Sequence, residues 1–353
     1  MMTLNVPLPG CAYDILIEKG LLNAAGDCIR KVLPRAKKLA VVTDSTVGPL
    51  YGARLQKSLA AADYDATLIT IPAGESSKSV AMLEWVYDRF MEFGLTRTDG
   101  VVALGGGVVG DLAGFAAATI LRGVDMVQIP TTLLAQVDSS VGGKVAVDLA
   151  AGKNLAGAFH QPKLVLIDPN LLGTLEDQTF ADGMAEVIKY GCILDTNFFL
   201  ELETMPSRAE IMANIEHILY TCCELKQRVV VLDQFDTGER MLLNFGHTLG
   251  HAYELSGNYT RYTHGQAVSA GMVRVAELGV TLGVTPPKIP GRIAVLLACF
   301  GLPIGIDCTP EEYKAAIGLD KKGAGADISL ILLAEIGKAV IHQMPKAELL
   351  TLL

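Results

Sequence analysis

The 353-residue chain contains no Cys-x-x-Cys pair, no long uninterrupted hydrophobic run and no excess of basic residues. Its odd number of cysteines, seven, argues against a disulfide framework and against a sulfur-ligated metal site. No stretch of about 18 apolar residues is present, and the start of the chain lacks the basic segment and apolar middle of a signal peptide. These absences predict a soluble, cytoplasmic protein with reduced cysteines.

The excess of acidic residues excludes two classes of partner. The formal net charge is −9, so both nucleic acid and an anionic membrane would be repelled. A small anionic substrate would need a local basic pocket inside this negative field. The length is too great for one ordinary core and suits two domains in one subunit.

Strands and helices alternate over the first half of the chain. Buried-type strands are expected at 13–17, 39–44, 67–71, 100–104, 124–129 and 163–168. Helices are expected at 21–32 and 47–62, and in the segments that end near residues 93 and 121. This alternation predicts a parallel sheet covered by helices on both faces, and therefore an α/β domain over residues 1–175.

A glycine-rich turn follows the strand expected at 100–104. Gly105, Gly107 and Gly110 have the spacing of the dinucleotide fingerprint, between a strand and a helix. Glycines let the backbone approach a diphosphate, and the helix start presents free N–H groups. The alternative is tight packing of the helix on the strand, because the turn follows a late strand and Asp111 would repel a phosphate.

Two lysines lie in glycine-bearing stretches between buried strands. Lys144 follows Gly142 and Gly143, and Lys153 follows Gly152. Loops of this kind combine main-chain donors with a point charge, as phosphate and carboxylate sites do. A solvated surface loop is the alternative for each lysine.

From about residue 176 the pattern changes to helices, which predicts a second domain at 176–353. Helices are expected at 180–194, 208–230, 246–256, 265–282, 290–300 and 310–318, and a late hairpin at 328–333 and 338–341. The predicted fold class is therefore an α/β domain followed by a helical domain.

Three of the six histidines lie close together in the second domain. His247 and His251 are four residues apart and share one helix face, and His264 follows them. With Glu186 of another expected helix, two of these imidazoles would form a three-ligand set that leaves a coordination position open, as in a catalytic zinc site. The spacing does not decide which two bind. The alternative is that the histidines are satisfied polar groups packed between helices.

With these motifs the chain resembles the 3-dehydroquinate synthases over nearly its whole length. The specific motifs are Val137-Asp138-Ser139-Ser140-Val141-Gly142-Gly143-Lys144 and Gly246-His247-Thr248-Leu249-Gly250-His251. Further motifs are Gly74-Glu75-x-x-Lys78, the glycine turn at 105–115, Arg122-Gly123, Gly152-Lys153-Asn154, the segment 185–191, Glu224-Leu225-Lys226, Arg240-x-x-x-Asn244, His264-Gly265 and the segment 320–322. The resemblance implies an N-terminal Rossmann-like NAD-binding domain, a C-terminal helical domain for metal and substrate, a cleft between them, and a homodimer.

The resemblance also implies a reaction. In that family, 3-deoxy-D-arabino-heptulosonate 7-phosphate is oxidised at C5 by NAD, loses phosphate, is reduced again at C5, opens, and closes to 3-dehydroquinate. This is a step of the shikimate pathway, which leads to chorismate and the aromatic amino acids. NAD is restored in each cycle, and a divalent cation polarises the substrate hydroxyls. The chain is thus expected to be a phosphate-eliminating lyase that depends on NAD and on Zn²⁺ or Co²⁺.

Carried over position by position, the resemblance assigns roles to metal and substrate residues. The metal ligands are Glu186, His247 and His264, and His251 lies beside the metal as a proton relay. The phosphate is held by Lys144, Asn154, Asn244 and Lys321, with Arg122 reaching across from the dimer partner. The substrate carboxylate is held by Lys226 and Arg240, and the hydroxyls by Asp138 and Lys189.

The resemblance assigns the NAD residues in the same way. Asp44 is the candidate for the ribose. The candidates around the diphosphate are Gly106, Gly107, Val108, Val109, Gly110, Asp111, Thr131 and Thr132. The residues that border the rest of the cofactor are Glu75, Lys78, Lys144, Lys153 and Thr174.

Two features depart from the pattern of that family, and a third concerns the surroundings of His251. Gln266 stands where members usually have Glu, which removes one charge near the metal and is expected to alter metal affinity or preference. Residues 175–179 replace a commoner Leu-Pro-x-Arg-Glu pattern near the expected NAD contacts. Glu254 lies three residues after His251 on the same helix face and is predicted to orient it.

Three other functions share part of this pattern. A sibling sugar phosphate cyclase would use the same metal, cofactor and elimination, but the siblings differ in the run from Val137 to Lys144. A metal-dependent polyol dehydrogenase would give no reason for Lys144, Lys226, Arg240 and Lys321 together. The intact set of ligand candidates argues against the third function, a binding module without activity.

Overall fold

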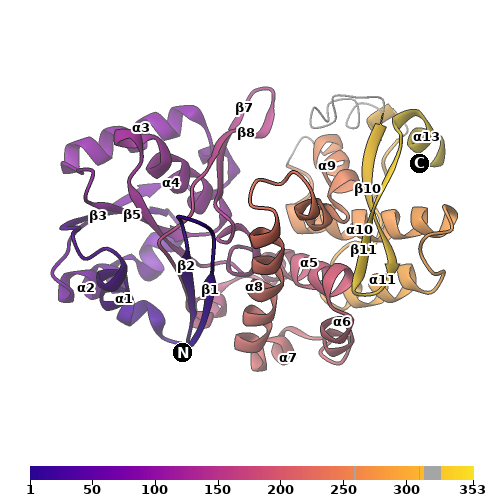
Figure 1. The fold of residues 1–353 in the computed structure, drawn as a ribbon, viewed down its shortest axis with the longest axis horizontal. Helices are drawn as coiled ribbons and strands as arrows, with labels where there is room; N and C mark the ends of the chain where they lie inside the picture. Colours follow the sequence, from indigo (N-terminus) through magenta and orange to yellow (C-terminus); the bar gives the residue numbers. More distant parts are fainter. Residues whose placement is uncertain (258–259, 310, 314–326) are drawn as a thin grey trace. The chain divides into compact units, whose positions relative to one another are not determined.

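The structure, a computed structural model, describes residues 1–353 except 258–259, 310 and 314–326 (Figure 1). The chain forms two compact units. The α/β unit comprises Met1–Leu175 and Lys226–Phe235, and the helical unit comprises Glu176–Leu225 and Asp236–Leu353. A single boundary after residue 175 would assign Lys226–Phe235 to the helical unit instead. No described helix is both long enough and apolar enough to cross a membrane.

The α/β unit is built around a seven-stranded sheet with the strand order β1-β2-β9-β6-β5-β3-β4. All neighbours are parallel except β1 and β2, which pair antiparallel. The strands are β1 (Met2–Val6), β2 (Tyr13–Ile17), β9 (Leu164–Ile167), β6 (Asp125–Pro130), β5 (Gly100–Gly105), β3 (Lys38–Asp44) and β4 (Asp65–Ile71). The predicted fold class is confirmed, and β1 is a strand that the sequence pattern did not indicate.

Helices cover both faces of this sheet (Figure 1). They are α1 (Ala25–Val32) and α2 (Ala53–Ala61) on one face, and α3 (Val80–Phe93) and α4 (Gly107–Thr119) on the other. Successive strand residues point to opposite faces, so Val41 packs in the first core and Val42 in the second. This is why the central strands are apolar at consecutive positions, and β5 is buried at every residue.

The glycine-rich stretch after β6 forms a hairpin, and the prediction of loops there was wrong. β7 (Lys144–Leu149) pairs antiparallel with β8 (Gly152–Phe159). Val145 and Val147 are buried, which gives β7 a period of two, but the glycines and alanines of β8 conceal the same period. Gly114 of α4 lets the hairpin approach, since a Cβ there would lie 2.3 Å from Cγ1 of Val145.

The helical unit contains the second half of the predicted helices and one hairpin. Its elements are α5 (Asp177–Leu194), α6 (Thr196–Glu203), α7 (Arg208–Ala213), the first part of α8 (Ile215–Leu232), α9 (His247–Ser256), α10 (His264–Thr281), α11 (Ile289–Cys299), α13 (Lys346–Leu352), β10 (Asp327–Glu335) and β11 (Lys338–Pro345). The helix predicted at 208–230 is interrupted at Asn214. The helix α6 was missed, although Asp195 caps its start by accepting from two backbone N–H groups. Most of the helix predicted at 310–318 lies outside the described residues.

Candidate metal and cofactor sites

Both candidate imidazole ligands stand at the first residue of a helix. His247 begins α9 and His264 begins α10, whereas Glu186 lies in the middle of α5. Gly246 precedes α9 with a φ of 80°, a left-handed conformation that glycine adopts without steric cost. The positions of the imidazoles are therefore set by helix starts.

The helices α9 and α10 approach each other at glycines. A Cβ on Gly271 of α10 would lie 2.1 Å from the carbonyl oxygen of Gly246 and 2.9 Å from the backbone nitrogen of Gly250. The missing side chains let the two backbones touch. As a result, the ring centroids of His247 and His264 are 5.3 Å apart.

The structure brings Glu186, His247 and His264 together. Each offers one ligand atom, and these atoms all lie within 4.8 Å of one another. Nε2 of His247 lies 3.6 Å from Oε1 of Glu186, and Nε2 of His264 lies 3.8 Å from the same oxygen. Within the described ranges, no other trio of His, Cys, Asp or Glu has such spacing.

The Glu186 carboxylate is buried, and its two oxygens differ in their surroundings. The residue is 1% exposed, and Lys189, one turn later on α5, forms an ion pair with Oε2. Among the described residues, Oε1 has no hydrogen-bond partner. A buried carboxylate oxygen without a donor is costly, and a divalent cation between Oε1 and the two imidazoles would remove that cost. The residues present thus fit a metal with three protein ligands and at least one open position.

The pKa values of the two histidines move in opposite directions. Burial lowers the pKa of His247 well below its usual value, which favours the neutral form that binds metals. Burial also acts to lower the pKa of His264, but the carboxylates of Glu254 and Glu186 outweigh it and the net shift is upward. Oε1 of Glu254 lies 3.7 Å from Nδ1 of His264. Glu254, predicted to orient His251, is therefore also placed to orient His264.

The predicted substrate residues of the helical unit are Lys189, Arg240, Asn244, His251 and Lys321. Lys189 and Arg240 are buried. Asn244 ends the 3₁₀ helix η7 (Glu239–Asn244), shortly before α9 begins. The ring centroid of His251 is 5.8 Å from that of His247, so this imidazole lies beside the cluster. Lys321 lies outside the described residues.

The glycine turn of the α/β unit forms the start of α4. Gly106 is the N-cap residue, and Gly107 is the first residue of the helix. A Cβ on Gly106 would lie 3.1 Å from Cγ2 of Thr132, which follows β6. Backbone N–H groups in the first turn of a helix have no intrahelical acceptor, so this turn can bind an anion.

Lys78, Asp111 and Asn154 form a polar cluster beside this turn. Nζ of Lys78 lies 2.6 Å from Oδ2 of Asp111 and also donates a hydrogen bond to Oδ1 of Asn154. Burial raises the pKa of Asp111 to about 6, although Lys78 acts to lower it. The negative charge that Asp111 would present to a diphosphate is thus offset by Lys78.

The remaining NAD candidates have partners within the α/β unit. Oδ1 of Asp44 accepts hydrogen bonds from two backbone N–H groups that follow β3. Oγ1 of Thr174 lies 2.6 Å from the hydroxyl oxygen of Tyr51. Nζ of Lys153 lies 3.9 Å from Oε1 of Glu75.

The predicted substrate residues of the α/β unit show two further features. Asp138 and Lys226 pair with each other, with Oδ1 and Nζ 2.8 Å apart. Asn154 and Arg122 have φ values of 56° and 70°, in the left-handed region that residues with side chains rarely adopt. Strain of this kind is concentrated at functional sites. Lys144 is exposed at the start of β7.

Two features of the sites were not predicted from the sequence. The pairing of Lys78 with Asp111 had no local signal, because the two residues lie on different elements. The start of α10 did have a local signal in the sequence, because Thr263-x-x-Gln266 has the capping-box spacing. That signature would have placed His264 at the first helical position.

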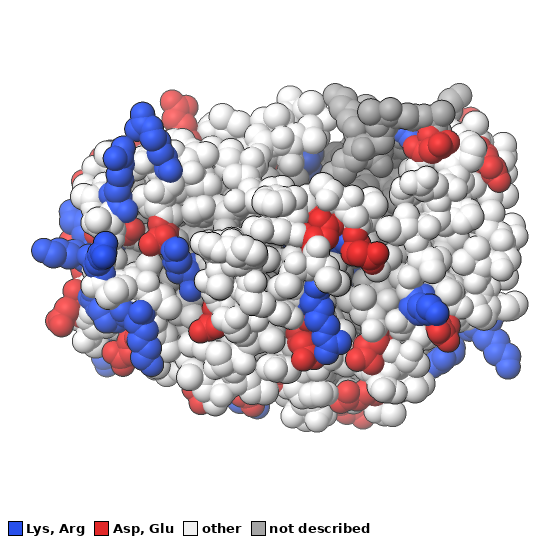
Figure 2. Space-filling model, viewed as in Figure 1, with Lys and Arg blue, Asp and Glu red and all other residues white. Residues whose placement is uncertain are grey.

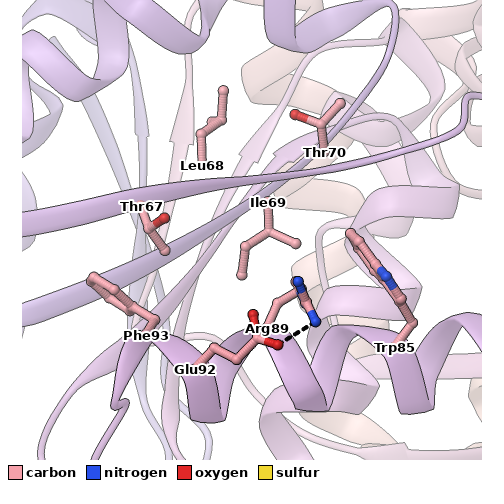
Figure 3. Close-up of a pocket in the computed structure, with 8 residues that line it drawn as sticks. All are labelled: Thr67, Leu68, Ile69, Thr70, Trp85, Arg89, Glu92 and Phe93. Atoms are coloured by element: carbon pink, nitrogen blue, oxygen red, sulfur yellow. Dashed lines mark hydrogen bonds and ion pairs between the residues drawn. The ribbon is translucent and has the colours of Figure 1, made fainter.

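Among the described residues, neither the surface charge nor the hollow in Figure 3 indicates a binding site for a further ligand. On the face in Figure 2, Lys and Arg are mixed with Asp and Glu. The hollow, of about 310 Å³, lies between the edge strand β4 and α3, and none of the predicted site residues lines it. Its charged residues, Arg89 and Glu92, pair with each other.

Comparison with known protein families gives two matches. The model described as 3-dehydroquinate synthase N-terminal matches residues 68–182, and the model described as 3-dehydroquinate synthase C-terminal matches residues 183–323. The 3-dehydroquinate synthase of Clostridium botulinum (strain Alaska E43 / Type E3) is 48% identical over 342 residues, which are 97% of each chain. That of Enterococcus faecalis (strain ATCC 700802 / V583) is 44% identical over 349 residues, 99% of this chain and 97% of the relative.

Solved structures with the same fold include two sugar-converting enzymes. The 2-epi-5-epi-valiolone synthase ValA from Streptomyces hygroscopicus subsp. jinggangensis 5008, with NAD⁺ and Zn²⁺ bound, has a TM-score of 0.88 and 29% identity over 96% of this chain and 95% of its own. A 2-deoxy-scyllo-inosose synthase, complexed with carbaglucose-6-phosphate, NAD⁺ and Co²⁺, also has a TM-score of 0.88, with 23% identity over 99% of each chain. The second likeness concerns the fold alone.

Proposed function

The chain belongs to the 3-dehydroquinate synthase family, and on this premise we propose that it converts 3-deoxy-D-arabino-heptulosonate 7-phosphate to 3-dehydroquinate and phosphate with NAD and a divalent cation. The observation that carries the metal part of the proposal is Oε1 of Glu186, a buried carboxylate oxygen that faces two imidazoles and has no hydrogen-bond partner among the described residues. The ammonium group of Lys189 lies at the other oxygen, Oε2.

The proposed ligands of the cation are Glu186, His247 and His264. Zn²⁺ and Co²⁺ both suit one carboxylate and two imidazoles, so the ligand set does not select between them. When bound, the cation would polarise the substrate hydroxyls and NAD would take up and return a hydride at C5. The ketone at C5 makes the C6 proton acidic, so loss of that proton and of the phosphate follows oxidation.

Two residues of the helical unit are proposed to act on the sugar hydroxyls. Lys189 is buried and holds its ammonium group at Glu186, so it can donate a hydrogen bond to a hydroxyl bound at the cluster. His251 lies beside His247 and is placed to exchange a proton with the substrate or with water. Arg240, which is also buried, is proposed to bind the substrate carboxylate together with Lys226.

In the α/β unit, the start of α4 is proposed to bind the NAD diphosphate. The turn at Gly106 and Gly107 brings backbone N–H groups close to Thr132, and glycine lets a phosphate approach. Lys78 compensates the charge of Asp111 next to that turn. The family resemblance implies the other proposed NAD contacts, which are Asp44, Glu75, Val108, Val109, Gly110, Thr131, Lys144, Lys153 and Thr174.

The phosphate of the substrate is proposed to bind basic and amide side chains, which are Lys144, Asn154, Asn244 and Lys321. Asp138 is proposed to bind a substrate hydroxyl, which would replace its ion pair with Lys226. The left-handed backbone at Arg122 supports a functional role for this residue, which we assign to contact with the substrate of a second subunit in a homodimer.

The deciding experiment is a phosphate-release assay with the heptulosonate phosphate, NAD and Zn²⁺. We expect release of phosphate without net NADH, and loss of release in metal-stripped protein. Net NADH without phosphate would indicate a polyol dehydrogenase. Phosphate release from another sugar phosphate in a substrate panel, but not from the heptulosonate, would indicate a sibling cyclase.

A further inference from the structure

Asp182 links the helix that carries Glu186 to the helix that begins with His264. It lies one turn before Glu186 on α5, so the two carboxylates project from the same face. Its Oδ1 accepts a hydrogen bond of 2.5 Å from the hydroxyl of Thr263, the N-cap residue of α10.

The same helix start is closed by a capping box. Oγ1 of Thr263 accepts from the backbone N–H of Gln266 at 3.3 Å, and Oε1 of Gln266 accepts from the backbone N–H of Thr263 at 3.1 Å. The glutamine thus supplies the reciprocal bond without a charge. A glutamate there would place a second negative group at a helix start that Asp182 already occupies.

Backbone packing between Gly265 and Asp182 also holds the start of α10 against α5. A Cβ on Gly265 would lie 2.3 Å from Cα of Asp182 and 2.6 Å from its carbonyl oxygen. The first turn of α10 therefore touches the backbone of α5 at this residue. Thr263 and Gly265 flank His264 in the chain, so both neighbours of the proposed ligand are fixed on α5.

We propose that Asp182 is a positioning residue that fixes the start of α10 on α5 and so sets the distance between His264 and Glu186. This inference rests on the proposed role of Glu186, His247 and His264 as metal ligands. Asp182 acts through Thr263 and needs no contact with the cation or the substrate.

The test is the affinity of the full chain for Zn²⁺ and Co²⁺, measured by competition with a chromophoric chelator. Asp182→Ala is expected to weaken binding about 10- to 100-fold, the usual effect of losing a group that orients a ligand. The absorption bands of bound Co²⁺ should shift, because the ligand geometry changes. The matched control is Asp177→Ala on the same helix, which removes an exposed ion pair with Arg208 and should leave affinity unchanged.

A second pair of variants keeps the test decisive if Asp182→Ala does not fold. Thr263→Val removes the hydroxyl at nearly constant size and should weaken metal binding, whereas Thr263→Ser keeps the hydroxyl and should bind as the unchanged chain does. Equal affinity in the valine and serine variants, or in Asp182→Ala and Asp177→Ala, would overturn the inference.

Glu186→Gln separates this inference from the proposed function. If Glu186→Gln binds metal as tightly as the unchanged chain, the proposed metal site itself is wrong. If Glu186→Gln loses the metal and Asp182→Ala does not, the site stands and the positioning role of Asp182 fails.

Discussion

The helical unit and the α/β unit differ in how their buried carboxylates are paired. In the helical unit, Lys189 forms an ion pair with Oε2 of Glu186, but Oε1 has no hydrogen-bond partner among the described residues although two imidazoles lie within 4 Å of it. In the α/β unit, two lysines proposed to meet ligands are paired with acids of the same unit, Lys78 with Asp111 at 2.6 Å and Lys226 with Asp138 at 2.8 Å. The helical cluster thus keeps one carboxylate oxygen open for a ligand, whereas the lysines of these two pairs are already engaged.

This difference predicts what determines the affinity of each unit for its ligand. A cation can enter the helical cluster without breaking a bond between side chains, so its affinity depends on how well the ligands are positioned. An anionic ligand of the α/β unit must share or replace an existing ion pair. Its affinity therefore depends on how much stronger the new contacts of the lysine are than the ion pair that is lost. The predictions below test this contrast.

The largest effect is expected from Glu186→Gln. Replacing the carboxylate removes the one negative ligand, so metal affinity should fall at least about 100-fold and phosphate release should be lost with it. Inductively coupled plasma analysis of dialysed protein measures the bound metal. The control is Glu176→Gln, which changes an exposed carboxylate at the start of the same helix. Full metal content in the Glu186 variant would show that the open carboxylate oxygen is not a metal ligand.

Gly271→Ala should disturb the helical unit next most strongly. The added Cβ would lie 2.1 Å from the carbonyl oxygen of Gly246, so α9 and α10 must separate, at a cost of about 1–3 kcal/mol in the free energy of unfolding. Urea unfolding measures this change, and metal affinity should fall with it while NAD affinity stays constant. Gly291→Ala on α11 is the control, because its Cβ would meet no atom within 4 Å, and it should be neutral or slightly stabilising. Equal stability of the two variants would refute the close approach.

Lys78→Met tests the balanced pair of the α/β unit. Removal of the ammonium group leaves Asp111 without its partner beside the start of α4, so NAD should bind about tenfold more weakly or worse, because a buried charge then lacks compensation. Nicotinamide or protein fluorescence titration measures the affinity, and metal affinity should not change. Lys163→Met, which removes an ion pair of 3.4 Å with Asp125 at the surface, is the control. An unchanged NAD affinity in Lys78→Met would mean that this pair does not serve the cofactor.

A pH dependence of stability is expected from Asp111. Burial raises its pKa in the folded chain from 3.8 to about 6, so the folded state holds this proton more tightly than the unfolded state does. The free energy of unfolding of the native chain, compared with that of Asp111→Asn, should therefore decrease as the pH rises through this window and stay level above it. Denaturant titrations between pH 4 and pH 7 measure the difference. A difference that is constant over this range would contradict the raised pKa.

Elements with strong periodicity could be predicted from the sequence, and those whose pattern is weak could not. The central strands are apolar at consecutive positions because both faces of the sheet are covered, and this signal located β3 and β5. The hairpin of β7 and β8 lacked such a signal because glycine and alanine alternate in β8 and carry little contrast. Among the described strands, β1 pairs with β2 alone, and its five residues were too few to show a clear pattern.

The candidate site could also be predicted only in part from the sequence. Residue types and spacing indicated a carboxylate and two of three histidines, and the choice of His247 and His264 came from the family resemblance. His247 and His264 come together because α9 and α10 touch at glycines, a contact that no local pattern encodes. The pairing of Lys226 with Asp138 was also hidden, because each was expected to meet the substrate instead.

The helix positions of the three proposed ligands have a consequence for how the protein matures. Glu186 lies on α5, whereas His247 and His264 begin α9 and α10, so no short segment of the unfolded chain contains all three proposed ligands. The cation can be captured only after these distant helices have docked, and it then stabilises the docked state by mass action. A newly made chain should therefore fold before it is loaded, and in metal-starved cells it should accumulate as an intact apoprotein with a lower melting temperature.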